Sequence, residues 1–165
     1  VNQKGFVELK NFDISNHFDD DMIIIEKLNY KKPISVIYYD GYKKQYFIKR
    51  FLINNKSSKL LIISDHKDSY LEIVTTDWYP QVEIVYVKEK GKERKKEIIN
   101  IHDFINVKGI KTQGNRLTSK SVKEINLLDP LPFEEEVPDV IVSPELNNQE
   151  KDTLNKSDGQ ITLEL

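Results

Sequence analysis

The sequence predicts an all-β protein, with about two propeller-like blades followed by a disordered acidic tail. Three observations lead to this fold class. Apolar and polar residues alternate with a period of two in several segments, turn-forming residues separate those segments, and one segment recurs weakly along the chain. Alternation with this period is typical of a pleated strand, because successive side chains point to opposite faces.

The first predicted hairpin joins residues 34–39 to residues 45–53. The segments "ISVIYY" and "QYFIKRFLI" are rich in the β-branched and aromatic residues that favour strands. Asp40-Gly41 lies between them, and this dipeptide suits a tight hairpin turn. A further strand is expected in "MIIIEKL" (22–28).

The second predicted hairpin joins "QVEIVYVKEK" (81–90) to "EIINI" (97–101), with a longer turn around Gly91. An alternating strand is then expected within "DFINV" (103–107), ending at a glycine-bearing segment. Helical candidates are few, and only 119–128 is expected to form a short turn of helix.

A weak internal repeat indicates a modular architecture. "GFVELKNFD" (5–13) aligns with "SYLEIVTTD" (69–77), and each copy is followed by a loop and an apolar hairpin with a basic turn. Units of roughly 50–60 residues suggest the blades of a propeller-like array. Two blades do not close a ring, so further blades are expected before Val1, which reads as the start of a fragment. A simple sandwich is the alternative.

Charge divides the chain into two predicted domains. Residues 1–127 have a balance of +6, from 23 Lys and Arg against 17 Asp and Glu, whereas residues 128–165 have a balance of −8, from 2 against 10. A basic body with an acidic tail is a pattern of polyanion binding, and a solvated surface with a solubilising tail is the alternative. The tail contains several prolines and few aromatic residues, so it is expected to be disordered.

Several kinds of chemistry fit this sequence poorly. Gly109 and Gly114 have the glycine spacing of a P-loop, but Asn115-Arg116 follows where that motif needs Lys and Ser or Thr. The three histidines are isolated from one another, the "HFDDD" run lacks the pattern of a calcium loop, and there is no cysteine. No metal site and no catalytic residue are therefore expected.

Four segments carry a resemblance to a known family: "ELKNFDISNHFDDDMIIIEKL", "ISVIYYDGYKKQYFIKRF", "TTDWYPQVEIVY" and "DFINVKGIKTQGNRLT". Together they resemble the C-terminal domain of the A-type subunit of bacterial DNA topoisomerase IV, in the family that also contains the A-type subunit of DNA gyrase. The resemblance covers about residues 4–135. It implies a β-pinwheel whose basic rim holds duplex DNA.

The resemblance also implies partners and a setting for the domain. Two A subunits would act with two ATP-hydrolysing B subunits in the bacterial cytoplasm, associated with the chromosome, and ATP and magnesium would belong to the B subunit. This chain has no Arg-Tyr dipeptide, so the strand-breaking tyrosine is expected upstream and the segment itself is not catalytic. The glutamine-arginine-glycine-lysine box of gyrase is also missing, which favours the topoisomerase IV type.

The predicted DNA contacts are thirteen basic residues on strands and turns, which would meet phosphates without reading sequence. They are Lys43, Lys44, Lys49, Arg50, Lys88, Lys90, Lys92, Arg94, Lys95, Lys96, Lys108, Lys111 and Arg116. Four glycines are expected to be structural, namely Gly41, Gly91, Gly109 and Gly114. Two alternatives remain for these regions: a solvated turn for 88–96, and a β-propeller or sandwich that binds proteins instead of DNA.

Overall fold

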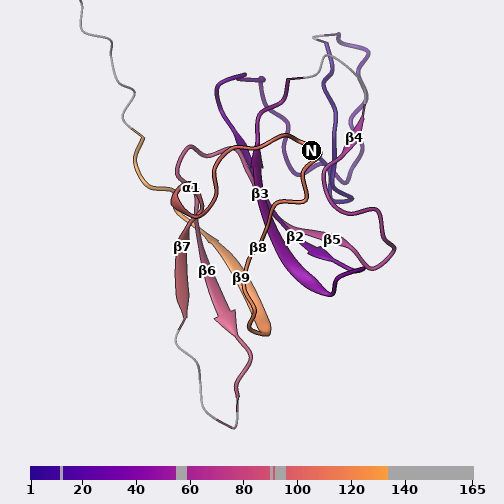
Figure 1. Cartoon of the computed structure of the whole chain (residues 1–165). Helices are drawn as coiled ribbons and strands as arrows, with labels where there is room; N and C mark the ends of the chain where they lie inside the picture. Colours follow the sequence, from indigo (N-terminus) through magenta and orange to yellow (C-terminus); the bar gives the residue numbers. More distant parts are fainter. Residues whose placement is uncertain (12, 55–58, 90, 92–95, 134–165) are drawn as a thin grey trace, which may run out of the picture. The chain divides into compact units, whose positions relative to one another are not determined.

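The structure is a computed structural model, and it describes residues 1–11, 13–54, 59–89, 91 and 96–133. These residues form three small antiparallel sheets and one helical turn, so the all-β fold class is confirmed (Figure 1). The elements are β1 (Phe6–Val7), β2 (Ile34–Asp40), β3 (Gln45–Phe51), β4 (Leu60–Leu61), β5 (Tyr70–Thr75), β6 (Gln81–Tyr86), β7 (Glu97–Asn100), α1 (Ile101–Phe104), β8 (Asn115–Arg116) and β9 (Val122–Leu128).

The first large sheet has the strand order β5-β2-β3-β8. The predicted β2–β3 hairpin is confirmed, with Asp40 opposite Gln45. The expected tight Asp-Gly turn is wrong, because four residues connect the strands and the residue with positive φ is Lys44, at 53°. The Asp40 carboxylate stabilises this wider loop by accepting hydrogen bonds from the backbone N–H groups of Tyr42 and Lys43.

The second large sheet has the order β7-β6-β9 and contains the predicted β6–β7 hairpin. The helical turn expected over 119–128 is wrong, since this segment forms β9 and pairs with β6 from Leu128 to Val122. Ile125 is buried opposite Ile84. Pairing along a free strand edge and burial of Ile125 outweigh the weak local helical preference.

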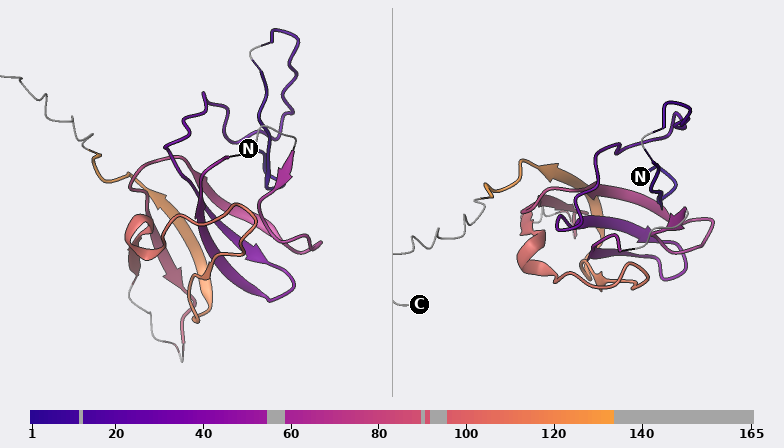
Figure 2. Two further views of the ribbon diagram at one scale, coloured as in Figure 1. Left: turned by 45° about the horizontal axis from the view of Figure 1, so that its top comes forward. Right: turned by 90° about the horizontal axis from the view of Figure 1, so that it is seen from above.

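Two other expected strands do not form. Residues 101–104 make α1 instead, and the Asn100 side chain caps this turn by accepting from the His102 N–H at 3.1 Å. In the segment 22–28, only Met22 pairs, through an isolated bridge to Asn2. The side chains of Ile23 and Ile25 are exposed, and Figure 2 shows this N-terminal segment (indigo) projecting as an irregular loop.

The internal repeat extends further than the alignment of 5–13 with 69–77. Residues 121–132 repeat residues 69–80, with serine, Glu-Ile, aspartate and proline at the same places in both. These segments contain β9 and β5, and each strand pairs with the first strand of the hairpin that precedes it. Both pairings also contain a register shift. A hairpin with a returning third strand is thus the unit that occurs twice.

Both faces of the sheet β5-β2-β3-β8 are buried. On one face, Ile37 and Ile48 belong to a cluster with Val82, Ile84 and Ile125 of the second sheet. The opposite face contributes to a second cluster, which extends to the N-terminal segment and consists of Val7, Ile34, Val36, Tyr38, Phe47, Phe51, Ile53, Ile62 and Val74. Most side chains of β2 and β3 are therefore buried whichever way they point, and Tyr39, Gln45 and Tyr46 are half-buried.

The ordered body continues beyond the expected boundary at Leu127. β9 includes Leu128, and the Leu131 N–H donates to the Tyr79 carbonyl at 2.9 Å. The Phe133 ring stacks on Trp78 with ring centres 4.4 Å apart. A single aromatic residue in the proline-containing segment anchors its start, which overall composition did not indicate. The rest of the predicted tail, residues 134–165, lies outside the described residues.

Candidate nucleic-acid interface

Residues 108–117, which we call the glycine loop, cover the edge of β3. The Lys108 N–H donates to the Arg50 carbonyl at 2.8 Å, and the Leu117 N–H donates to the Tyr46 carbonyl at 2.9 Å. Between these two contacts, β8 pairs with β3 through Arg116 opposite Phe47 and Asn115 opposite Ile48. The glycine loop is therefore held against β3 at both of its ends and between them.

Buried side chains of β2 and β3 hold the underside of the glycine loop. The Lys49 ammonium donates to the carbonyls of Ile110 and Thr112, at 2.9 and 3.3 Å. The Tyr38 hydroxyl donates to the carbonyl of Gln113 at 2.9 Å. The Gln113 side-chain amide in turn donates to the Asp40 carboxylate at 2.9 Å. The side chains of Lys49, Tyr38 and Asp40 thus fix the conformation of residues 110–113.

Gly114 is required by both backbone conformation and space. Its φ is 90°, and a Cβ atom at this position would lie 2.2 Å from the Ile48 carbonyl oxygen. Only glycine allows the loop to approach β3 so closely. Gly41 also lacks space, because a Cβ atom there would lie 2.6 Å from the backbone of Asp68.

The other two glycines expected to be structural are less constrained. Gly91 has a φ of 76° but open space around it, and Gly109 has neither a positive φ nor a close neighbour. Gly91 is therefore required for its backbone conformation alone. The structure gives no packing or conformational reason for glycine at position 109.

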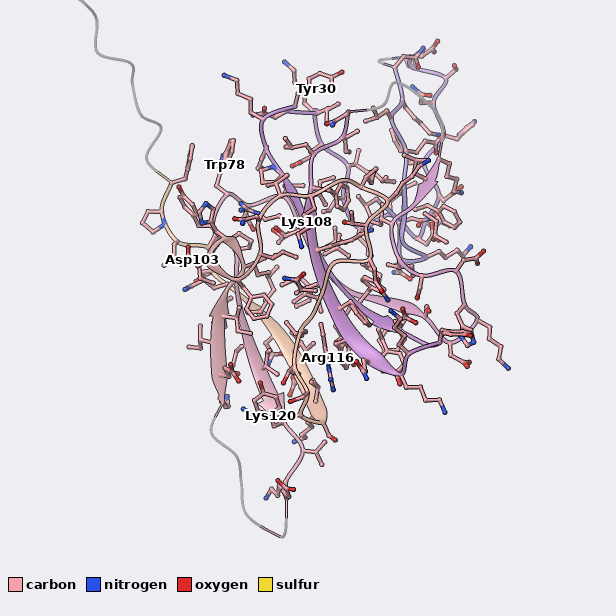
Figure 3. All side chains as sticks on the ribbon, viewed as in Figure 1. Tyr30, Trp78, Asp103, Lys108, Arg116 and Lys120 are labelled. Carbon is pink, nitrogen blue, oxygen red and sulfur yellow. The ribbon has the colours of Figure 1, made fainter. Side chains whose placement is uncertain are left out.

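The outer side of the glycine loop carries exposed positive charge. Lys108, Lys111 and Arg116 are all exposed, and no Asp or Glu occurs between positions 104 and 123. Lys108 and Arg116 appear one below the other in Figure 3, followed by Lys120. Lys43 joins the same region from the β2–β3 turn, since its ammonium donates to the Gln113 side chain. Lys44, next to it, is exposed.

Lys49 and Arg50 were also expected among the DNA contacts, but both side chains are in the interior, each 4% exposed. They point to opposite faces of β3, and both faces are covered. The Arg50 guanidinium donates to the carbonyl of Trp78. Burial lowers the pKa of Lys49 from 10.5 to about 8, and it also lowers the pKa of Arg50. Neither charge is presented at the surface.

The β6–β7 turn holds the largest predicted basic cluster, but only part of it can be placed. Lys90, Lys92, Arg94 and Lys95 lie outside the described residues. Lys88 and Lys96 are exposed, and the Lys96 ammonium is 2.9 Å from the Glu83 carboxylate. Hydrogen bonding to Lys96 lowers the pKa of Glu83. At least one lysine of this cluster is therefore already paired with a carboxylate.

Lys120 was not among the predicted DNA contacts. Its ammonium lies 4.6 Å from the centre of the Tyr86 ring and 3.5 Å from a Glu97 carboxylate oxygen. Lys120 follows the end of the glycine loop by only three residues. This short separation in the sequence could have indicated that its charge lies beside the loop. The anchoring role of Lys49 had no such signal, because it depends on contacts across 61 residues.

The described residues contain no group of three or more His, Cys, Asp or Glu side chains that could hold a metal ion. His66 lies 3.8 Å from the carboxylate of Asp68, and His102 lies 3.0 Å from the carboxylate of Asp103 within α1. What the geometry offers is a rigid, glycine-bearing edge with cationic side chains, which suits binding to an extended anion.

Comparison with known families places the chain in one of them. Residues 1–129 match the family described as "Topoisomerase C-terminal domain, Bacteroidota". The chain belongs to this family. The match includes all three sheets and the glycine loop, and it confirms the resemblance to a topoisomerase C-terminal domain. No curated protein and no solved structure matches the chain.

Membership in this family makes the chain part of a topoisomerase. No helix in the described part of this C-terminal domain is long and apolar enough to cross a membrane. Among the described residues, the glycine loop combines exposed cations with a backbone that is anchored from below.

Proposed function

We propose that this topoisomerase C-terminal domain holds duplex DNA without sequence preference, as part of the A-type subunit of a type II enzyme. The observation that carries the proposal is the glycine loop. Three exposed cations, Lys108, Lys111 and Arg116, stand on a backbone that Lys49 and Tyr38 fix from below. Phosphate contacts of this kind supply affinity and are indifferent to base sequence.

Non-specific holding suits an enzyme that passes one duplex through another at any site. In the proposed assembly, two A subunits act with two B subunits, and the B subunits hydrolyse ATP with magnesium. The strand-breaking tyrosine belongs to another part of the A-type chain. The absence of the gyrase-type box from this sequence supports a topoisomerase IV type enzyme, which relaxes and decatenates DNA in the bacterial cytoplasm.

The repeated hairpin unit supports a larger, pinwheel-like arrangement of blades in the whole protein. Its copies at β2–β3–β5 and β6–β7–β9 have the same pairing order, as expected for modular blades. The basic turns of further blades would continue the same DNA-holding rim.

Titration with two unrelated duplexes at several salt concentrations tests the proposed function. Similar affinities for both duplexes, with log affinity falling linearly with log salt, are expected because bound phosphates release counterions. Strong preference for one duplex, or no binding at low salt, would contradict DNA holding and favour a β module that binds proteins.

A further inference from the structure

The backbone of the glycine loop has an inner and an outer side. The carbonyls of Ile110, Thr112 and Gln113 accept hydrogen bonds from the buried Lys49 and Tyr38 side chains. A trans peptide unit is planar, and its C=O and N–H groups point in opposite directions. The N–H groups of the following residues, Lys111, Gln113 and Gly114, therefore point away from the sheet.

These three N–H groups have no acceptor within the described part of the chain. The neighbouring N–H groups do: Lys108 donates to Arg50, Thr112 donates to Gly109, and Leu117 donates to Tyr46. Backbone donors are normally satisfied by protein, water or ligand. Several adjacent N–H groups that turn the same way form a concave site for anions.

The surroundings of these donors favour an anion. Lys111 belongs to the site itself, and Lys108 and Lys43 flank it. The nearest carboxylate contacting the loop is Asp40, which is 2% exposed. Both of its oxygens accept hydrogen bonds, from Gln113 on one side and from the N–H groups of Tyr42 and Lys43 on the other. Asp40 is therefore a buried carboxylate whose oxygens are engaged within the protein and are not exposed beside the site.

We propose that the backbone N–H groups of Lys111, Gln113 and Gly114 form a seat for one phosphate group of the DNA backbone, with Lys49 and Tyr38 as positioning residues. This inference rests on the proposed function and adds a specific contact to it. Lysine side chains alone would give a mobile, adjustable attraction. A seat of fixed N–H donors sets the position of one phosphate, and with it the register of the duplex on the domain.

Amide NMR of the whole chain labelled with ¹⁵N tests the seat directly. Addition of a short duplex should shift the Lys111, Gln113 and Gly114 amide signals most strongly. Gly5 serves as an internal control, because its amide already donates to the Asn2 carbonyl at 3.0 Å and lies outside the glycine loop and the β6–β7 turn, so it is expected to move little. A parallel titration with inorganic phosphate should shift the same three amides with much weaker affinity.

A pair of tyrosine variants tests the positioning role. Tyr38→Phe keeps the ring stacked on Phe47 but releases the Gln113 carbonyl, and it should weaken duplex binding about fivefold, the order expected for one lost hydrogen bond. It should also reduce the duplex-induced shift of Gly114. Tyr46→Phe is the matched control, since the Tyr46 hydroxyl bonds Tyr70 and not the loop, and it should leave both readouts unchanged.

The outcomes separate this inference from the proposed function. Salt-dependent duplex binding with no movement of the three amides would overturn the seat and leave DNA holding intact. Shifts with inorganic phosphate but not with duplex would mean an adventitious anion site and overturn the assignment to DNA. Absence of duplex binding under any salt condition would overturn both. The wild-type titration gives these answers even where a variant fails to fold.

Discussion

The glycine loop and the β6–β7 turn have similar compositions but different structures. Each combines a glycine at positive φ with several lysines or arginines. In the glycine loop, a buried lysine and a buried tyrosine fix the backbone, and Gly114 lies against β3. In the β6–β7 turn, Gly91 has open space and Lys96 is paired with Glu83.

If the glycine loop holds DNA as proposed, the number of cations in a segment is a poor guide to a phosphate site. A charged turn balanced by glutamates gains little from binding a further anion, because part of its charge is already neutralised. A loop without carboxylates, held from below by the protein interior, offers both unpaired charge and fixed geometry. Four changes to the chain test this difference between the glycine loop and the β6–β7 turn.

Charge reversal in the glycine loop should have the largest effect. Lys111→Glu with Arg116→Glu removes two cations and adds two anions, so duplex affinity at low salt should fall by about a hundredfold, or roughly 3 kcal/mol. Both side chains are exposed, and the far-UV circular dichroism of the β sheets should remain unchanged. The matched pair Lys88→Glu with Lys96→Glu should cost less, and a larger loss there would reverse the comparison.

Alanine at each glycine tests the difference in close packing. Gly114→Ala should lower the free energy of unfolding by about 3 kcal/mol, because a Cβ atom overlaps the Ile48 carbonyl in addition to the strain of a positive φ. Gly91→Ala should cost only about 1 kcal/mol, since it has the strain but no overlap. Gly109→Ala, without either, should be close to neutral. Denaturant unfolding measures all three, and equal costs at Gly114 and Gly91 would contradict the close approach to β3.

The buried Lys49 predicts an unusual dependence of stability on pH. Its pKa is about 8 in the folded protein and 10.5 in the unfolded chain, so above pH 8 the unfolded state binds more protons. Stability contributed by this group therefore rises with pH, by about 2 kcal/mol between pH 8 and pH 9.5. Above that range the tyrosines act in the opposite direction, since burial raises the pKa of Tyr38 to about 12.

Lys49→Met isolates this effect because methionine keeps an apolar side chain in the same space. Urea unfolding at pH 7.5, 8.5 and 9.5 should show a rise for the wild-type protein and a flat profile for the variant across this range. A flat wild-type profile would show that Lys49 is not desolvated, and it would remove the basis for its role beneath the loop.

The acidic segment should have the smallest effect. Residues 134–165 contain nine of the ten Asp and Glu residues of the segment 128–165. We predict that they compete with DNA for the lysines of residues 1–127. A chain ending at Phe133 should bind duplex about twofold more tightly at low salt, with the gain lost as salt screens the attraction. A chain that ends at Leu127 is a poorer test, because it also loses the stacking of the Phe133 ring on Trp78. Equal binding of both chains at low salt would show that no such competition occurs.

Much of the fold was predictable from local pattern. Alternation identified β2, β3 and β6 because these strands have strong β propensity and lie in hairpins, where the partner is close in sequence. Local pattern gave the wrong structure for β9 and for residues 22–28. Whether these segments form strands depends on which strand edge is available for pairing. Residues 122–128 pair with the edge of β6, whereas in the segment 22–28 only Met22 forms a β-bridge.

The candidate site was predictable only in its outer part. The sequence indicates Lys108, Lys111 and Arg116 because they are adjacent to the glycines, and the structure places all three at the surface. The buried state of Lys49 and Arg50 was not predictable, since a strand of alternating pattern gives no sign that both of its faces are covered. The anchors Tyr38 and Lys49 act across more than 60 residues, beyond the reach of any local motif.

The slope of log affinity against log salt tests the central claim, that the anchored glycine loop meets DNA phosphates, most directly. Lys111→Gln with Arg116→Gln removes two cations without adding repulsion, and the slope should become shallower by about two. Lys88→Gln with Lys96→Gln should change the slope less, because Lys96 is already paired with Glu83. An unchanged slope in the first pair, with a reduced slope in the second, would place the DNA on the β6–β7 turn and contradict the account.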